Sequence, residues 1–131
     1  LGTEREEDAR RLARAVVASN LVKAAIFGAE PNWGRVVAAL GAEAARSEIP
    51  LDIGRMSLKI QDMLLFKGGR PVPFEADALR SLLRRSDALI RIELGGGPGK
   101  ATAWGCDLSY DYVRINADYA AVVVEDRGGL V

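Results

Sequence analysis

The chain has 131 residues, a length typical of one domain, and its 18 Lys and Arg residues are balanced by 18 Asp and Glu residues. Because nucleic acids and anionic membranes are usually bound through excess positive charge, this balance argues against both as partners. The chain has one cysteine and no histidine, which excludes an internal disulfide, the usual zinc sites and an imidazole base, so we expect no metal site.

The first segment, residues 3–19, is predicted to be an amphipathic surface helix. Its apolar residues follow the spacing of one buried stripe, and Thr3 and Glu6 have the spacing of a capping box. The charged N-terminus does not resemble a signal peptide, and no apolar run approaches the roughly 20 residues that span a bilayer. We therefore expect a cytoplasmic protein without a membrane partner.

The next two segments are short and differ in pattern. Leu21–Gly28 is apolar and closed by glycine, which predicts a buried strand. Residues 31–41 are expected to form a helix that ends at its last residue, Gly41. Either Trp33 simply anchors this helix in the core, or Asn32 and Arg35 bind an anionic group near the helix N-terminus.

Strands and a further helix are expected in the middle of the chain. Strands are predicted in three stretches, 56–61, 62–72 and 88–94: apolar residues alternate in the first and the third, and the second has the pattern of a hairpin arm. The second stretch is expected to turn at Gly68–Gly69, and a helix is expected at 74–86. Strands and helices mix without strict βαβ alternation, which favours an α+β fold in a single domain over residues 1–131.

The glycine-rich stretch GGGPGKAT, residues 95–102, is tested against a phosphate-binding loop. It fails, because three residues separate Gly95 from Gly99 where four are needed, and Lys100 is not followed by Ser or Thr. We interpret it as a turn that leads into one or two strands within residues 100–119. Cys106 in this stretch is expected to be a small buried hydrophobe.

The stretch SYDYVRINADYAA, residues 109–121, alternates in a way that predicts an extended strand. In such a strand Tyr110, Tyr112, Arg114 and Asn116 share one face, and the opposite face carries the apolar row Val113, Ile115 and Ala117. The polar row suits a small polar molecule or a subunit contact, and an ordinary surface strand is the competing interpretation.

Two long motifs carry a resemblance to a known family. LVKAAIFGAEPNWGRVVAALG and ATAWGCDLSYDYVRINADY, in this order and at a fitting distance, resemble the C-terminal part of the glutamate N-acetyltransferase / ornithine acetyltransferase family of arginine biosynthesis. The resemblance covers most of the chain, as far as about Tyr119.

The resemblance implies an acetyltransferase whose precursor cleaves itself before a threonine. The new N-terminal Thr starts the β chain, takes acetyl from N-acetylornithine and passes it to glutamate; some members also accept acetyl-CoA as co-substrate. It implies an N-terminal-threonine-nucleophile enzyme without a metal or tightly bound cofactor, in which α and β chains assemble as α2β2. Asn116 matches a substrate-binding position of the family's closing motif.

The chain departs from the family in three places. No small-residue–Thr-Met-Leu motif is present, so we expect the nucleophilic Thr upstream of Leu1, no catalytic residue in this chain, and no activity from this segment alone. Ala121 stands where the family has a substrate-binding hydroxyl residue. Residues 121–131 continue past the usual end and are expected to form a tail extension.

Two alternatives remain beside the acetyltransferase. A paralogous acyltransferase with a different substrate would account for Ala121 and the tail. A non-catalytic domain that keeps the fold for subunit assembly would also carry these motifs.

Overall fold

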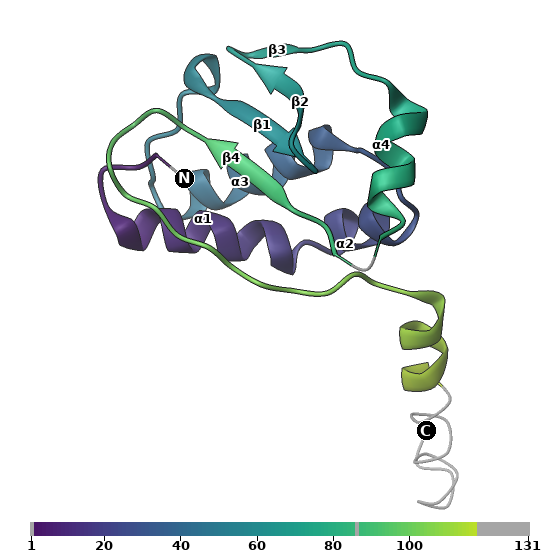
Figure 1. The fold of residues 1–131 in the computed structure, drawn as a ribbon. Helices are drawn as coiled ribbons and strands as arrows, with labels where there is room; N and C mark the ends of the chain where they lie inside the picture. The colour runs from purple at the N-terminus through teal and green to yellow at the C-terminus, as the bar shows by residue number, and fades with distance from the viewer. Residues whose placement is uncertain (1, 86, 118–131) are drawn as a thin grey trace, which may run out of the picture.

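A computed structural model of the protein describes residues 2–85 and 87–117 (Figure 1). Within these residues an antiparallel sheet is combined with helices, which confirms the predicted α+β class. The helices are α1 (Glu6–Ala18), α2 (Asn20–Phe27), α3 (Trp33–Arg46), the short 3-10 helix η1 (Ile53–Arg55) and α4 (Ala76–Leu83). The strands are β1 (Ser57–Ile60), β2 (Met63–Lys67), β3 (Arg70–Pro71) and β4 (Ile90–Glu93).

The sheet has the order β3-β2-β1-β4, and every neighbouring pair is antiparallel. The predicted turn at Gly68–Gly69 is confirmed, because it joins β2 to β3. Both glycines have positive φ, 61° and 80°, which side chains other than glycine rarely adopt. The three predicted strands are confirmed with shorter bounds.

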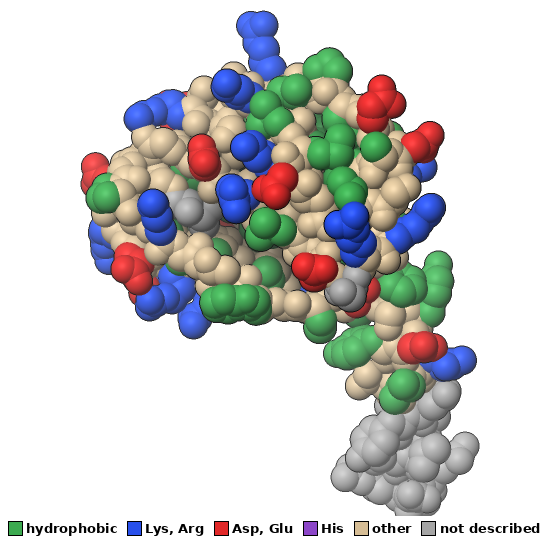
Figure 2. All heavy atoms as spheres, in the orientation of Figure 1, with side chains coloured by type: hydrophobic (Ala, Val, Ile, Leu, Met, Phe, Trp, Pro, Cys, Tyr) green, Lys and Arg blue, Asp and Glu red, His purple; other side chains and the backbone are tan. Residues whose placement is uncertain are grey.

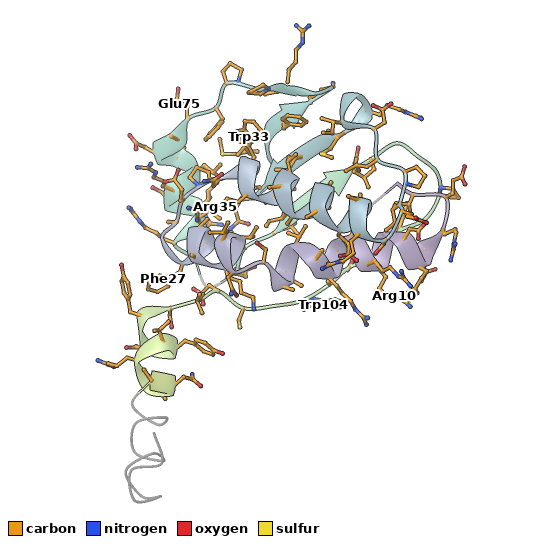
Figure 3. The ribbon with its side chains drawn as sticks, turned by 180° about the vertical axis from the view of Figure 1, so that it is seen from behind. Arg10, Phe27, Trp33, Arg35, Glu75 and Trp104 are labelled. Atoms are coloured by element: carbon orange, nitrogen blue, oxygen red, sulfur yellow. The ribbon has the colours of Figure 1, made fainter. Side chains whose placement is uncertain are left out.

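The core lies between the sheet and a helical layer. Helices α1 and α3 pack against each other on one side of the sheet (Figures 1 and 3), and alternate residues of β1 are buried beneath them. The fully buried side chains of this core are Leu12, Val36, Leu40, Met56, Leu58, Ile60, Leu65 and Leu79.

The prediction of a strand at Leu21–Gly28 is wrong, because residues 21–27 lie in α2 and Gly28 caps its end. The Ser19 side chain caps this helix by accepting a hydrogen bond from the Val22 N–H at 3.3 Å. Val22 and Ala25 are buried while Leu21 remains 63% exposed, so one face of the helix packs on its neighbours. A short apolar run is ambiguous between strand and helix, and packing on α1 and α3 decides here.

The predicted capping box of α1 is also wrong. The helix begins at Glu6 with Arg5 at its N-cap, and no side chain makes a capping hydrogen bond. Thr3 is instead buried and pairs with Gly99 in an isolated antiparallel bridge. Its hydroxyl donates to the Arg5 carbonyl at 2.6 Å, so Thr3 fixes the chain just before the helix.

Helix α3 begins close to its predicted start but continues past Gly41 to Arg46. Nothing lies within 4 Å of the position that a Gly41 Cβ would take. The residue therefore sits in open space on the helix and does not break it. A glycine weakens a helix interior without necessarily ending it.

Residues 100–109 form no strand, and residues 110–117 are helical, so the strands predicted within 100–119 are wrong in the described part. The helical segment 110–117 projects from the body of the domain (Figure 1). Cys106 is exposed, in contrast to its expected burial. Ala121 and the expected tail extension lie outside the described residues.

Candidate functional site

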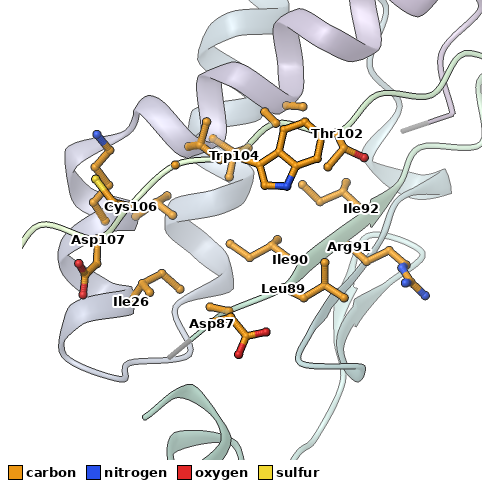
Figure 4. A pocket seen from close by; sticks show the side chains of 18 of the residues that line it. Ile26, Asp87, Leu89, Ile90, Arg91, Ile92, Thr102, Trp104, Cys106 and Asp107 are labelled. Carbon is orange, nitrogen blue, oxygen red and sulfur yellow. The ribbon is translucent and has the colours of Figure 1, made fainter. Parts of the chain in front are cut away.

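A groove with a volume of about 1620 Å³ lies between β4, helices α1 and α2, and the extended residues 100–107 (Figure 4). Its floor is apolar and comes from both layers of the fold. The apolar side chains that line it include Val16, Val17, Val22, Ile26, Ile90 and Ile92.

Charged side chains occupy the margins of this groove. Asp87 and Arg91 come from the β4 side, and Asp107 comes from the opposite side (Figure 4). Lys23 of α2 also lines the groove. In the described part of the chain, no three His, Cys, Asp or Glu residues gather in a group that would hold a metal ion. The lining therefore suits a largely apolar occupant with polar ends.

Trp104 lies at the open side of the groove, above the β4 side chains (Figure 4). Its side chain is 84% exposed, whereas a tryptophan is normally among the more buried residues. The helical segment 110–117 carries further exposed apolar residues, including Tyr110, Val113 and Ile115. Figure 2 shows green side chains on this segment, and green, red and blue ones mixed over the body of the domain. Several of the exposed large apolar side chains thus lie within residues 104–117.

The proposed anion site at the start of α3 is occupied by structural contacts. The Asn32 side chain accepts a hydrogen bond from the Arg35 N–H at 3.2 Å, as a helix N-cap does. The Arg35 guanidinium donates to the Leu21 carbonyl at 2.9 Å, which ties α3 to α2. Trp33 packs against Phe66 with ring centroids 5.1 Å apart, which agrees with the core-anchor interpretation (Figure 3).

Asn116, the predicted substrate-binding residue, lies on the exposed helical segment 110–117. Its amide nitrogen donates to the Tyr112 carbonyl at 2.8 Å, and the residue as a whole is exposed. The predicted polar row does not exist, because in a helix residues two apart do not share a face. The other residues of that predicted row are arranged differently. Arg114, for example, forms an ion pair with Asp111 at 2.8 Å.

The helical segment is attached to the domain at its start. The Leu108 N–H donates to the Lys23 carbonyl at 3.3 Å. The Tyr110 ring meets the Phe27 ring edge-on, with centroids 5.1 Å apart. Both anchors lie on α2, so this helix sets where the segment leaves the domain.

Among the described residues, one carboxylate has a resolved shift of its pKa. The hydrogen bond from Arg46 holds the pKa of Glu43 below its usual value, and a second hydrogen bond from the Ser47 hydroxyl at 2.9 Å acts in the same direction. All three residues lie at the C-terminal end of α3, away from the groove lining. This shift therefore marks a helix end and not a reactive site.

The fold and the sequence agree on the relatives of this chain. The crystal structure of arginine biosynthesis bifunctional protein ArgJ from Bacillus halodurans matches 90% of the chain with a TM-score of 0.84 at 36% sequence identity, and the match covers 54% of that chain. The family model of the ArgJ family matches residues 1–121. The chain belongs to the ArgJ family.

Relatives within the ArgJ family are similar over most of this chain. Arginine biosynthesis bifunctional protein ArgJ of Parasynechococcus marenigrum is 50% identical over 114 residues, which are 87% of this chain and 27% of that protein. Glutamate N-acetyltransferase of Methanopyrus kandleri is 47% identical over 120 residues, which are 90% of this chain and 30% of that protein. The chain thus spans less than a third of these curated relatives.

The ArgJ-family membership confirms the resemblance carried by the two motifs. Sequence reasoning missed the groove, because its walls come from segments that are far apart in the chain. The strands predicted within residues 100–119 included one wall of the groove, residues 100–107, which the structure leaves outside the sheet.

Proposed function

We propose that this chain is the C-terminal part of an acetyltransferase of arginine biosynthesis, which moves acetyl from N-acetylornithine to glutamate. The ArgJ-family match over residues 1–121 carries this proposal. It is supported by 47% identity to a relative that is named glutamate N-acetyltransferase. The alternatives of a different substrate or of a purely structural domain have no comparable support.

The proposed reaction has two acetyl-transfer steps. A threonine hydroxyl upstream of Leu1 attacks the acetyl carbonyl of N-acetylornithine, with the threonine's own α-amine as base, and the C–N bond breaks to release ornithine. The glutamate amine then attacks the acetyl ester and regenerates the hydroxyl. Acetyl-CoA is a second donor to be tested. The scheme needs no metal and no tightly bound cofactor.

The proposed contribution of this chain is to carry Asn116 to the substrate. The side chain stands on a helical segment outside the packed core, so it is presented to groups beyond these residues. The Asn116 amide oxygen is a hydrogen-bond acceptor, which suits the ammonium group of an ornithine or glutamate substrate. The core of this chain then acts as the rigid support of that segment.

We also propose an α2β2 assembly of cleaved chains that works in the cytoplasm. The exposed apolar side chains of residues 110–117 and Trp104 support further contacts with polypeptide. The single exposed thiol of Cys106 suits a reducing compartment. Mass spectrometry of the native assembly, before and after denaturation, gives the number of chains and the site of cleavage.

An acetyl-transfer assay on the product of the whole gene tests the proposed activity. Labelled N-acetylornithine is the donor and glutamate the acceptor, with labelled acetyl-CoA as donor in a parallel reaction. Label on glutamate from N-acetylornithine supports the proposal. A correctly cleaved protein that transfers label from neither donor contradicts it.

The role of Asn116 is tested in the same assay with Asn116→Ala. Loss of one hydrogen bond to a charged group costs about 1.5–3 kcal/mol, so kcat/KM for N-acetylornithine should fall roughly 10-fold or more. Asp111→Asn is the matched control, since it lies on the same helical segment, about 140° around the helix axis from Asn116. Unchanged kinetics in Asn116→Ala would show that Asn116 does not bind the substrate.

A further inference from the structure

The extended residues 100–107, here called the strap, have no backbone hydrogen bond to any described residue. The nearest such bonds are at its two ends, where Gly99 pairs with Thr3 and the Leu108 N–H donates to Lys23. Ala101 and Ala103 are half-buried while Thr102 and Trp104 are exposed, which is the alternation of a β-strand. The strap therefore has the form of a strand but lies outside the sheet.

Strand β4 is an edge strand, and its free edge faces the groove. Gln61, just after β1, lies opposite Leu89, just before β4, and its N–H donates to the Leu89 carbonyl at 2.9 Å. The backbone groups of Leu89 in this pair therefore point towards the β1 side, as in a hydrogen-bonded pair of an antiparallel ladder. The β1–β4 register continues from there without a shift, and hydrogen-bonded pairs alternate along it. The backbone N–H and C=O groups of Ile90 and Ile92 consequently point away from β1, towards the groove.

A glycine-rich turn connects β4 to the strap. Between them the chain reverses at residues 95–99, so β4 and the strap run in opposite directions (Figure 1). Two backbone hydrogen bonds between Thr3 and Gly99 hold the far side of the turn. A Cβ at Gly97 would stand 2.8 Å from the Thr3 carbonyl oxygen, so only glycine fits this close approach.

Two rows of backbone groups without described partners thus border one apolar groove. An exposed edge of this kind is a template for pairing with another strand. The groove volume, about 1620 Å³, exceeds the roughly 300–1,000 Å³ of small-molecule pockets. Its floor of Val16, Ile90 and Ile92 favours an occupant with apolar side chains on one face.

We propose that an extended segment of the same gene product, from outside residues 1–131, inserts between β4 and the strap as a β-strand. Most of the polypeptide in the curated relatives lies outside the matched part, since the match covers 27% and 30% of two of them. The inserted strand runs parallel to one neighbour and antiparallel to the other. Trp104 then covers the inserted strand and loses its exposure.

Amide hydrogen exchange on the complete protein tests whether a strand is present. Strand insertion predicts that amides in residues 101–107, and those of Ile90 and Ile92, exchange at least about 100-fold more slowly than unprotected amides. The inference concerns assembly alone, so this measurement does not depend on acetyl transfer. Exchange of the strap amides at nearly unprotected rates would overturn it.

Photo-crosslinking identifies the occupant. A benzoylphenylalanine replaces Trp104 in the complete protein, and in a control it replaces Arg70, which is exposed on β3. We expect the Trp104 probe, but not the Arg70 probe, to crosslink to a segment outside residues 1–131 within one copy of the gene product. A crosslink to residues 118–131, or to an unrelated protein, contradicts the proposal. So does a crosslink between two copies of the gene product, which an isotope-labelled mixture of copies reveals.

Discussion

Thr3 and Gly99 are joined by two backbone hydrogen bonds, one in each direction, with N–O distances of 3.3 Å and 2.6 Å. This bridge connects the start of the described chain to the glycine-rich turn after β4. It fixes the direction in which residues 100–107 leave the sheet. The close approach depends on the absence of a side chain at Gly99.

Gly99→Ala should therefore destabilise the domain. A Cβ at this position would stand 2.7 Å from the Thr3 carbonyl oxygen, closer than real Cβ contacts occur. We expect a loss of about 1–3 kcal/mol, as in other overpacked sites. A fall in the midpoint of thermal unfolding of the complete protein measures it, and an unchanged midpoint would show that the bridge is dispensable.

Gly41→Ala is the matched control and should act in the opposite direction. The new Cβ meets nothing within 4 Å, and the residue lies inside helix α3. Alanine should stabilise the helix by roughly 0.5–1 kcal/mol. A fall in the unfolding midpoint would mean that this face of α3 is covered in the complete protein.

Gln61→Ala should loosen the contact between α4 and β4. The Gln61 amide nitrogen donates to the Leu82 and Asp87 carbonyls at 3.1 Å and 2.9 Å, and its oxygen accepts from the Leu89 N–H at 2.9 Å. Each lost hydrogen bond costs about 0.5–1.5 kcal/mol.

Amide exchange in the Gln61→Ala variant gives the measurement. We expect the Leu89 N–H to exchange faster, while amides inside α3 keep their rates. Exchange at the wild-type rate would show that Gln61 does not hold this junction.

Asn32→Ala should cost about 1 kcal/mol of stability, because the Arg35 N–H loses its capping partner. Asn32→Ser keeps a capping oxygen and should retain most of the stability. If Asn32 bound an anion instead, both variants would lower catalytic activity without the difference in unfolding midpoint. Thermal unfolding and the acetyl-transfer assay on both variants separate the two roles.

Glu43 makes a pH-dependent contribution to the stability of the folded domain. Its pKa is lowered in the folded state from an ordinary value of 4.5, chiefly by the Arg46 hydrogen bond. The stabilisation is therefore complete above the unfolded pKa and disappears as pH falls through the lower folded pKa. Glu43 is half-buried, but its partner Arg46 is exposed to solvent, so the effect should be small.

Glu43→Gln tests this dependence. The unfolding midpoints of the wild type and the variant should differ more at about pH 7 than at about pH 3. A difference of the same size at both values would assign the contribution to packing and not to the charge.

The sequence alone determined those features that follow from local chemistry. Apolar periodicity located α1 and α3, and alternation located the sheet strands. The glycine pair at Gly68–Gly69 located the β2–β3 turn, since few other residues adopt its backbone angles. The two long motifs pointed to the ArgJ family, which the comparisons confirm.

Tertiary structure decided what local pattern leaves ambiguous. Residues 21–28 are apolar enough for a strand or a helix, and packing against α1 and α3 selects the helix. Thr3 has the spacing of a cap, but its pairing with Gly99 places it in a bridge. The strap has the alternation of a strand, yet a strand exists only when a neighbour satisfies its backbone groups, and that neighbour is a long-range choice.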